Sequence, residues 1–346
     1  MVQHSASLTE QALSRLRPEG SGLELSPYFE PFLAKSEYNI LYTDYIGTDE
    51  IRAKAAQNPG LEGREVPAVD FVWTPGRPLI ECAPPNVQFD YAIASHVMEH
   101  VPNPVGWIND VLTVMKTGGR LALFLPDRRR TSDYFRQETQ YHQLVQWWIE
   151  QPVVPTPGQV LDFMSLAFEH RHGLDIPWAE LDGGKTLPPF YNTNFALDAA
   201  ILVHNEMHYV DVHCSVWNAE TFKGVFDKVV EAGLLNVTVE VTGDLGSSEF
   251  LVILTKLGEP AVRPPGRRMT FKPGPVATTT SIPAAMEGSG IENAVHQLSI
   301  LRHDMAFVAK LVSDTSAEML ALQRYQQLGL VRRAWRKLKR VLKRIL

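Results

Sequence analysis

Apolar positions gather in two short runs within residues 89–130, and these runs predict two buried strands. Residues 89–94 form the first run and residues 121–125 the second. Strands that are buried on both faces read as continuous apolar runs rather than as an alternation of apolar and polar residues. The second run ends in Pro126-Asp127, which marks the end of its strand.

Between the two runs the apolar pattern changes to helical spacing. Large apolar side chains recur from Trp107 to Met115 at intervals of three and four, as on the buried face of a helix. Lys116 stands in the predicted last turn, and Gly118-Gly119 is expected to end the helix as a C-terminal cap. A strand, a helix and a second strand make a βαβ unit, and therefore a parallel sheet.

Polar residues crowd the point where the first predicted strand ends. Ser95, His96, Glu99 and His100 follow it directly. Open α/β sheets bind their ligands beyond the carboxyl ends of the strands. The pattern therefore predicts a functional site at this edge of the sheet.

Further strands are predicted on both sides of this unit. They are the runs 22–25, 40–44 and 69–73 upstream, and 237–241 and 250–256 downstream. Together with FDYAIASHVMEHV and MKTGGRLALFLPD, these runs resemble the class I S-adenosylmethionine (SAM) dependent methyltransferases of type 11, of the kind found in bacterial polysaccharide and O-antigen biosynthesis. The resemblance covers about residues 20–257, with an insertion at about 128–215. It implies an α/β, Rossmann-like sheet with a helical insertion, closed by an antiparallel pair of strands at 237–241 and 250–256. Within the insertion we expect a helix over 128–150 and a long loop or lid over 173–194.

The resemblance also implies SAM as cofactor and a set of residues that bind it. In the family, the loop after the first strand approaches the methionine part of SAM, and an acid after the second strand accepts hydrogen bonds from the ribose hydroxyls. Two departures stand out, because Ser26 occupies a position where the family usually has glycine, and Thr74 occupies one where an acid is common. Trp73 could pack on the adenine or simply belong to the core. The residues that correspond to the cofactor site are Glu24, Ser26, Pro27, Tyr28, Asp44, Trp73, Thr74, Ser95 and His96.

Spaced histidines and a glutamate in the run His96-x-x-Glu99-His100 raise the question of a metal site. Histidine and glutamate on one turn can ligate zinc. The run differs from the HExxH pattern, and the same residues recur in the methyltransferase family without a metal role. We therefore expect no metal, with His96 beside the sulfonium of SAM and Glu99 and His100 as structural residues.

Methyl transfer to a sugar hydroxyl would profit from a general base, and histidine is the usual one. The segment 207–214 is rich in polar and aromatic residues and resembles a segment of methyltransferases linked to bacterial polysaccharides. Asp211 and His213 could form an oriented base there, although each could also be an ordinary hydrogen-bonding residue. His96 is a further catalytic candidate, and His100, Asp127 and His208 are other options for the base.

Composition fits a globular protein with a specialised C-terminal end. The chain has 346 residues, 45% hydrophobic and 21% charged, and only two cysteines, so a reducing cytoplasmic location is expected. Residues 331–346 carry eight Lys or Arg and no acid. The formal charge of −6 for the whole chain therefore becomes −14 without them. Trp335 and neighbouring apolar residues form one face of this basic segment, which favours an anionic membrane surface over nucleic acid as its partner.

The chain divides into four predicted parts. Residues 1–257 form the methyltransferase domain, and residues 258–290 form a linker rich in proline and glycine. Residues 291–327 carry a heptad pattern that predicts a coiled coil and a homo-oligomer, or a single helix docked on the domain. Residues 328–346 form a basic amphipathic helix at the inner membrane face.

These features predict SAM-dependent O-methylation of a sugar of a lipid-linked glycan at the cytoplasmic face of a bacterial membrane. The main alternative is an inactive methyltransferase-like scaffold that recruits glycan-assembly proteins. Methylation of a small lipid or quinone is a third hypothesis.

Overall fold

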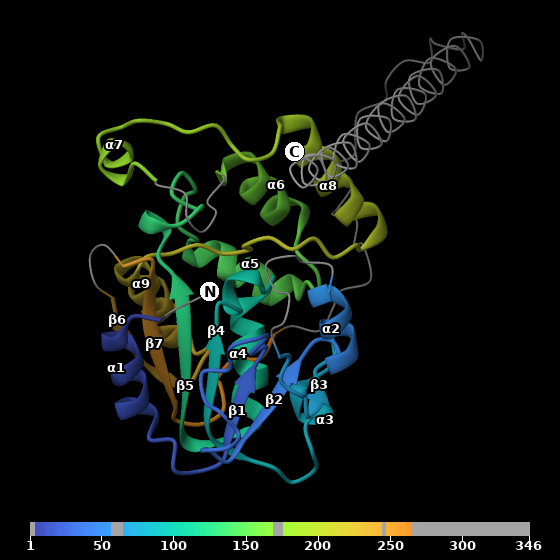
Figure 1. The fold of residues 1–346 in the computed structure, drawn as a ribbon, viewed down its shortest axis with the longest axis vertical. Coiled ribbons are helices and arrows are strands. Elements are labelled where there is room, and N and C mark those ends of the chain that lie inside the picture. Colours follow the sequence, from blue (N-terminus) through green and yellow to red (C-terminus); the bar gives the residue numbers. More distant parts are fainter. Residues whose placement is uncertain (1–3, 57–64, 169–175, 244–246, 265–346) are drawn as a thin grey trace, which may run out of the picture. The chain divides into compact units, whose positions relative to one another are not determined.

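The computed structural model describes residues 4–56, 65–168, 176–243 and 247–264. All of them belong to one compact unit, Met1–Met269. Figure 1 shows a central sheet with helices on both of its faces and a group of helices beyond one end of the strands.

A seven-stranded sheet with the order β3-β2-β1-β4-β5-β7-β6 forms the centre of this unit. Strands β1 to β5 run parallel, and β7 is antiparallel to both β5 and β6. The predicted parallel sheet, closed by an antiparallel pair, is therefore confirmed. The third strand is shorter than predicted. The strands are β1 Gly22–Leu25, β2 Ile40–Asp44, β3 Phe71–Val72, β4 Phe89–Ser95, β5 Met115–Pro126, β6 Val237–Thr242 and β7 Glu249–Lys256.

Each face of the sheet has its own apolar core, which explains the continuous apolar runs. On β4, Ala92 and Ala94 pack into a core formed with α4, α5 and α9, whereas Tyr91 and Ile93 pack into a second core against α1. Successive side chains of a strand point to opposite faces, so a strand covered on both sides needs apolar residues throughout. The α-helices are α1 Ala6–Leu16, α2 Thr48–Ala56, α3 Leu79–Cys82, α4 Pro104–Thr113, α5 Tyr141–Glu150, α6 Pro157–Leu166, α7 Trp178–Asp182, α8 Thr193–Glu206 and α9 Ala219–Glu231.

The prediction for the end of α4 is wrong. The helix ends at Thr113, and Met115 already begins β5, where it pairs with Phe89. The pairing then jumps to Tyr91 with Arg120, so the segment with the two glycines lies in an irregularity of the strand rather than in a helix cap. Gly118 has φ +82, a conformation that suits such an extra loop in a ladder.

The expected helix across residues 128–150 is also wrong in its first half. Residues 128–130 form only a 3-10 turn, and α5 begins at Tyr141. The intervening segment is held by a buried ion pair between Asp133 and Arg136, with 2.7 Å between Arg136 Nη1 and Asp133 Oδ1. Because buried charges need partners, this ion pair fixes the position of the segment, which contributes to the site described below.

The insertion between β5 and α9 has a small core of its own. Helices α6 and α8 pack together around Val160, Ala200 and Val203, and Val212 and Cys214 of the following segment complete the core. In Figure 1, α6, α7 and α8 lie beyond the carboxyl ends of the parallel strands. The predicted helical insertion over the sheet edge is thus present, and the loop predicted over 173–194 contains α7 where it is described.

The predicted coiled coil and basic amphipathic helix lie outside the described residues, as does most of the predicted linker. Within the described residues, every helix is too short or too polar to cross a bilayer.

Candidate functional site

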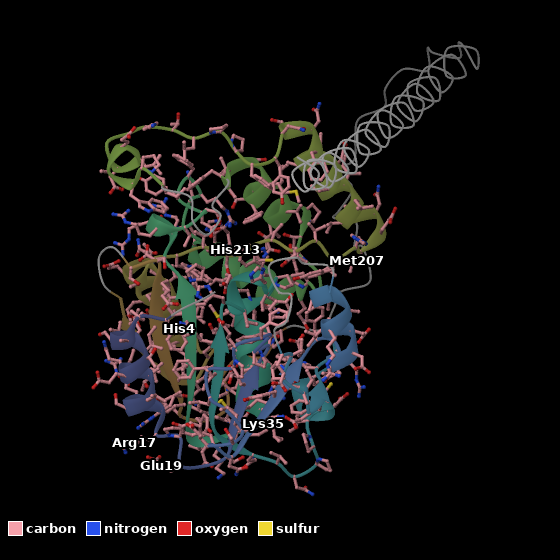
Figure 2. All side chains as sticks on the ribbon, in the orientation of Figure 1. His4, Arg17, Glu19, Lys35, Met207 and His213 are labelled. Atoms are coloured by element: carbon pink, nitrogen blue, oxygen red, sulfur yellow. The ribbon has the colours of Figure 1, made fainter. Side chains whose placement is uncertain are left out.

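The predicted cofactor residues meet at one edge of the sheet. Ser26 directly follows β1, Asp44 ends β2, and Ser95 ends β4 with His96 next to it. Because these strands are parallel neighbours, their carboxyl ends share an edge. In Figure 2, His213 lies near this end of the sheet, whereas Arg17 and Glu19 lie at the opposite end.

Glu24 forms hydrogen bonds with the backbone of the loop that follows β1. Its carboxylate accepts hydrogen bonds from the backbone N–H of Phe32 at 2.6 Å and of Leu33 at 3.3 Å. The side chain is buried, which raises the pKa of Glu24 to about 7 despite these two donors. We infer that Glu24 holds the loop in place, since both of its oxygens already have backbone partners.

Ser26 adopts the backbone conformation that glycine would take. Its φ is +51, in the left-handed region, and its N–H donates to Thr43 O at 2.7 Å. This explains the usual glycine at this position in physical terms. Replacing glycine by serine therefore keeps the loop conformation at a cost of about 1 kcal/mol.

Asp44 stands beside this loop, buried at 4% exposure. Burial raises the pKa of Asp44, and the backbone N–H groups of Tyr45 and Ile46 and the hydroxyl of Ser26 oppose that rise. The Tyr45 N–H lies 2.7 Å from Asp44 Oδ1. This carboxylate lies at a strand end next to a glycine-like turn, where the resemblance predicts the ribose of SAM. That contact stays a prediction.

Trp73 and Thr74 follow β3, and Tyr28 lies in the loop after β1. The indole of Trp73 stacks on Trp107 with 6.0 Å between ring centroids, and its N–H donates to Arg77 O. Tyr28 has φ +52 and is 43% exposed, and Thr74 is exposed. The packing of Trp73 on Trp107 is a core role, so its contact with adenine stays a prediction.

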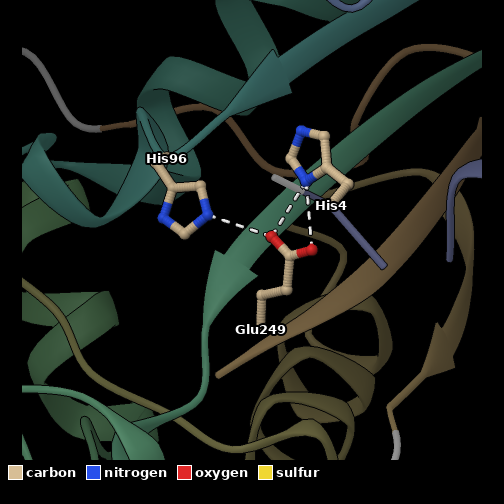
Figure 3. A group of neighbouring side chains, drawn as sticks. All are labelled: His4, His96 and Glu249. Atoms are coloured by element: carbon tan, nitrogen blue, oxygen red, sulfur yellow. Dashed lines mark hydrogen bonds and ion pairs between the residues drawn. The ribbon is translucent and has the colours of Figure 1, made fainter. Parts of the chain in front are cut away.

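His96 belongs to a cluster that its sequence neighbours do not reveal. Its Nε2 lies 3.1 Å from Glu249 Oε2, and His4 Nδ1 lies 2.9 Å from the same oxygen. Figure 3 shows both imidazoles turned toward the Glu249 carboxylate. His4 Nε2 in turn contacts Ser95 Oγ at 3.2 Å. We call His4, His96 and Glu249 the Glu249 cluster.

The charges of the Glu249 cluster weaken the case for His96 as a base. Burial alone would lower the pKa of His96, but the carboxylates of Glu249 and Glu99 raise it to about 9. Conversely, although burial would raise it, His4 and His96 lower the pKa of Glu249 to about 2. A pKa raised in this way favours the protonated form of His96 near neutral pH, which does not suit a general base.

A second cluster surrounds Glu99, which lies in a 3-10 turn after β4. Glu99, His100 and His213 each offer one ligand-type atom, and these atoms lie within 4.8 Å of one another. The backbone brings them together, because the N–H groups of Cys214 and Ser215 both donate to Glu99 O. We call Glu99, His100 and His213 the Glu99 cluster.

The structure corrects the predicted pairing of Asp211 with His213. His213 Nδ1 instead lies 2.5 Å from Asp133 Oδ2, while Asp211 Oδ1 lies 2.9 Å from His100 Nδ1. Val212, between the two residues, is buried in the insertion core, and Asp211 itself is exposed. The oriented histidine thus exists, but Asp133 orients it.

Asp133 is held firmly enough to orient His213. It is 2% exposed and forms an ion pair with Arg136, which also donates to His213 O at 2.9 Å. Although burial would raise it, His213 and Arg136 hold the pKa of Asp133 well below its usual range. Asp133 is therefore a carboxylate at any ordinary pH, and it fixes the Nδ1 side of the His213 ring.

Sequence reasoning missed His4, Asp133, Arg136 and Glu249 as site residues. Partners as distant as His4 and Glu249 leave no local pattern. Asp133 and Arg136 could have been suspected as site residues from the sequence. They are an acid and an arginine three residues apart, and they follow a strand that ends at the functional edge.

One family model matches the N-terminal part of the chain. Residues 3–173 match the family model Methyltransf_23, described as a methyltransferase domain. The match covers β1 to β5 and the start of the insertion, and it supports SAM as the cofactor. No curated protein matches the chain.

Several solved structures are similar in part. The CurJ carbon methyltransferase is 12% identical, with 72% of this chain and 52% of that chain covered and a TM-score of 0.35. A SAM-dependent methyltransferase from Thermotoga maritima is 12% identical, with 72% and 88% covered and a TM-score of 0.32. One from Aquifex aeolicus is 12% identical, with 71% and 88% covered and a TM-score of 0.33. This chain spans about half the length of the first of these. With TM-scores this low, the fold assignment rests on the strand order itself.

Proposed function

We propose that the chain O-methylates a sugar hydroxyl of a lipid-linked glycan with SAM as methyl donor, since residues 3–173 match a methyltransferase domain. The observation that carries this proposal is the pair of His213 and Asp133 at the cofactor edge of the sheet. A sugar hydroxyl is a poor nucleophile at neutral pH, and a histidine oriented by a carboxylate is the group that promotes loss of its proton.

The reaction needs little more than positioning. The hydroxyl oxygen attacks the methyl carbon of SAM, the carbon–sulfur bond breaks, and S-adenosylhomocysteine leaves with the bonding electron pair. The hydroxyl proton passes toward His213, and in-line alignment supplies most of the acceleration. The cofactor would be held by the loop at Ser26, by Asp44 and by the region of Ser95 and His96.

Exposed tyrosines support a saccharide acceptor. Tyr45 and Tyr209 are 43% and 45% exposed, and their ring centroids lie 6.2 Å apart. Tyr209 also lies 3.2 Å from Asp211, through its hydroxyl. Aromatic faces with a polar rim suit sugars, which combine apolar faces with hydroxyl edges.

The setting of the reaction follows from the C-terminal sequence. The basic amphipathic segment 331–346 favours an anionic membrane surface, and the heptad pattern of 291–327 favours a homo-oligomer. We therefore place the enzyme at the cytoplasmic membrane face, without nucleic acid as a partner.

The test uses the full-length chain, SAM labelled on its methyl group, and separate extracts of lipid-linked glycans and of small lipids from bacterial membranes. We expect label in the glycan fraction and a loss of about 100-fold or more in the rate for His213→Asn. His142→Asn, at an exposed position of α5, serves as the matched control. SAM binding is measured separately by calorimetry. Label in the small lipids alone contradicts the acceptor class, and absence of SAM binding contradicts the enzyme proposal.

A further inference from the structure

Glu99 is a buried carboxylate without hydrogen bonds. It is 1% exposed, and neither Oε1 nor Oε2 has a hydrogen-bond partner among the described residues. The nearest imidazole nitrogens are His96 Nδ1 at 3.4 Å and His100 Nε2 at 4.0 Å from Oε1. His96 thus pairs with Oε1 by charge, but no hydrogen bond reaches Oε2 within the described residues. Because buried polar atoms are ordinarily hydrogen-bonded, this carboxylate points to a missing ligand.

The two histidines of the Glu99 cluster are arranged as metal-bound histidines usually are. His100 Nδ1 faces Asp211, and His213 Nδ1 faces Asp133. A metal-ligating histidine commonly donates its other N–H to a carboxylate, which fixes the ring and its tautomer. His213 Nδ1 has a hydrogen bond to Asp133, and His100 Nδ1 has an ion-pair contact with Asp211. The Nε2 atoms therefore remain available to a ligand beside Glu99.

From these two observations we propose that Glu99, His100 and His213 bind a divalent transition-metal ion such as Zn²⁺. Two imidazoles and one carboxylate are a ligand set that zinc accepts in three-ligand sites, where further positions stay open for water or substrate. The ligand atoms already lie within 4.8 Å of one another, so small side-chain shifts would bring all three to an ion.

The sequence pattern led us to expect no metal from the run His96-x-x-Glu99-His100. The inference departs from that expectation because the third ligand, His213, comes from a distant segment and His96 is not part of the set. His96 belongs to the Glu249 cluster, whose ligand-type atoms also lie close together. There, however, the Glu249 carboxylate already has hydrogen bonds to His4, His96 and the Ser5 N–H, so nothing calls for an ion.

A bound ion would also refine the role of His213, a step that rests on the proposed function. With the ion present, His213 would be a ligand rather than the base. The ion would then supply a bound hydroxide that could take up the proton of the acceptor hydroxyl as it becomes water. Binding of the ion itself does not depend on methyl transfer.

The test is a titration of chelator-treated, full-length chain with Zn²⁺ against a chromophoric chelator, and with Co²⁺ monitored by its visible absorption. We expect one equivalent to bind. Loss of outer partners alone weakens metal sites by about 10- to 100-fold, so Glu99→Gln and His213→Asn should each weaken binding by more than about 100-fold. His4→Gln and His142→Asn should retain the full affinity.

Folding is checked for every variant by circular dichroism without metal. Glu99→Gln loses no hydrogen bond among the described residues, so we expect it to fold, and Zn²⁺ should raise the melting temperature of the wild type but not of this variant. Absence of stoichiometric binding by the folded wild type overturns the inference, as does unchanged binding by Glu99→Gln. Neither readout involves SAM or an acceptor, so the proposed function stands or falls separately.

Discussion

Two clusters of the same residue types lie at one edge of the sheet, yet they differ in how their carboxylates are satisfied. In the Glu249 cluster, one glutamate binds two histidines and a backbone N–H. In the Glu99 cluster, the glutamate has no hydrogen bond within the described chain, while the two histidines face outer acids. Equal composition therefore does not mean equal function.

The difference has a physical consequence for stability. A carboxylate that is paired and hydrogen-bonded stabilises the fold, whereas a buried one without such bonds costs free energy until a ligand binds. The Glu249 cluster thus holds the N-terminal segment against β4 and β7. In the Glu99 cluster, the carboxylate can still bind a ligand. The same acid-to-amide substitution should therefore change the free energy of unfolding differently in the two clusters.

The largest effect is expected at the outer acids of the Glu99 cluster, where Asp133 and Asp211 differ in burial. Asp133→Asn should lower the free energy of unfolding by about 3 kcal/mol, because it leaves Arg136, which is itself buried, with a weakened partner. Asp211→Asn should cost less than about 1 kcal/mol, because the acid is exposed. Urea unfolding in the presence of a chelator measures both. Equal losses would show that the two histidines are held alike.

The next effect compares the two central glutamates directly. Glu249→Gln should lower the free energy of unfolding by about 2 to 3 kcal/mol, since it removes the charge from several charge-assisted hydrogen bonds. Glu99→Gln in metal-free protein should change it by less than about 1 kcal/mol or raise it, because the substitution removes only the ion pair with His96 at 3.4 Å and relieves the cost of burying a charge. Chemical unfolding at pH 7 gives both values. A greater loss for Glu99→Gln would remove the distinction between the clusters.

Sequence alone could predict the frame that carries both clusters. The apolar runs of β4 and β5 are long and continuous, and runs of this kind predict central strands that are buried on both faces of a sheet. The strand ends then placed Ser26, Asp44 and His96 at one edge. The pattern failed at Gly118 and Gly119, because an irregular strand and a helix cap use glycine for the same backbone freedom.

The partners within the clusters could not be predicted in the same way. Whether His213 meets Asp211 or Asp133 depends on how the insertion folds back on the sheet, where the N–H of Cys214 donates a hydrogen bond to Glu99 O. Contacts between His4 and Glu249 depend on the two ends of the domain meeting. Such pairings are set by tertiary packing, which no local spacing encodes.

The smallest effect is the pH dependence of stability that Glu249 contributes. It tests the Glu249 cluster by lowering the pH. The pKa of Glu249 is lowered from 4.5 to about 2 in the folded chain. Its contribution to stability is thus present above about pH 4.5 and is lost as the pH falls toward 2. Between pH 5 and pH 3 the wild type should lose about 2 kcal/mol more than Glu249→Gln, which cannot titrate at this position.

Urea unfolding of both proteins at several pH values between 3 and 6 measures this difference, with a chelator present so that metal plays no part. The two curves should converge as the pH falls, because protonation of Glu249 in the wild type removes the same charge as the substitution. Parallel curves would show that Glu249 is not charged when its histidines bind it. In that case the charge of Glu249 would not be paired by the histidines of its own cluster. The contrast between a structural and a ligand-binding cluster would then have to rest on Glu99 alone.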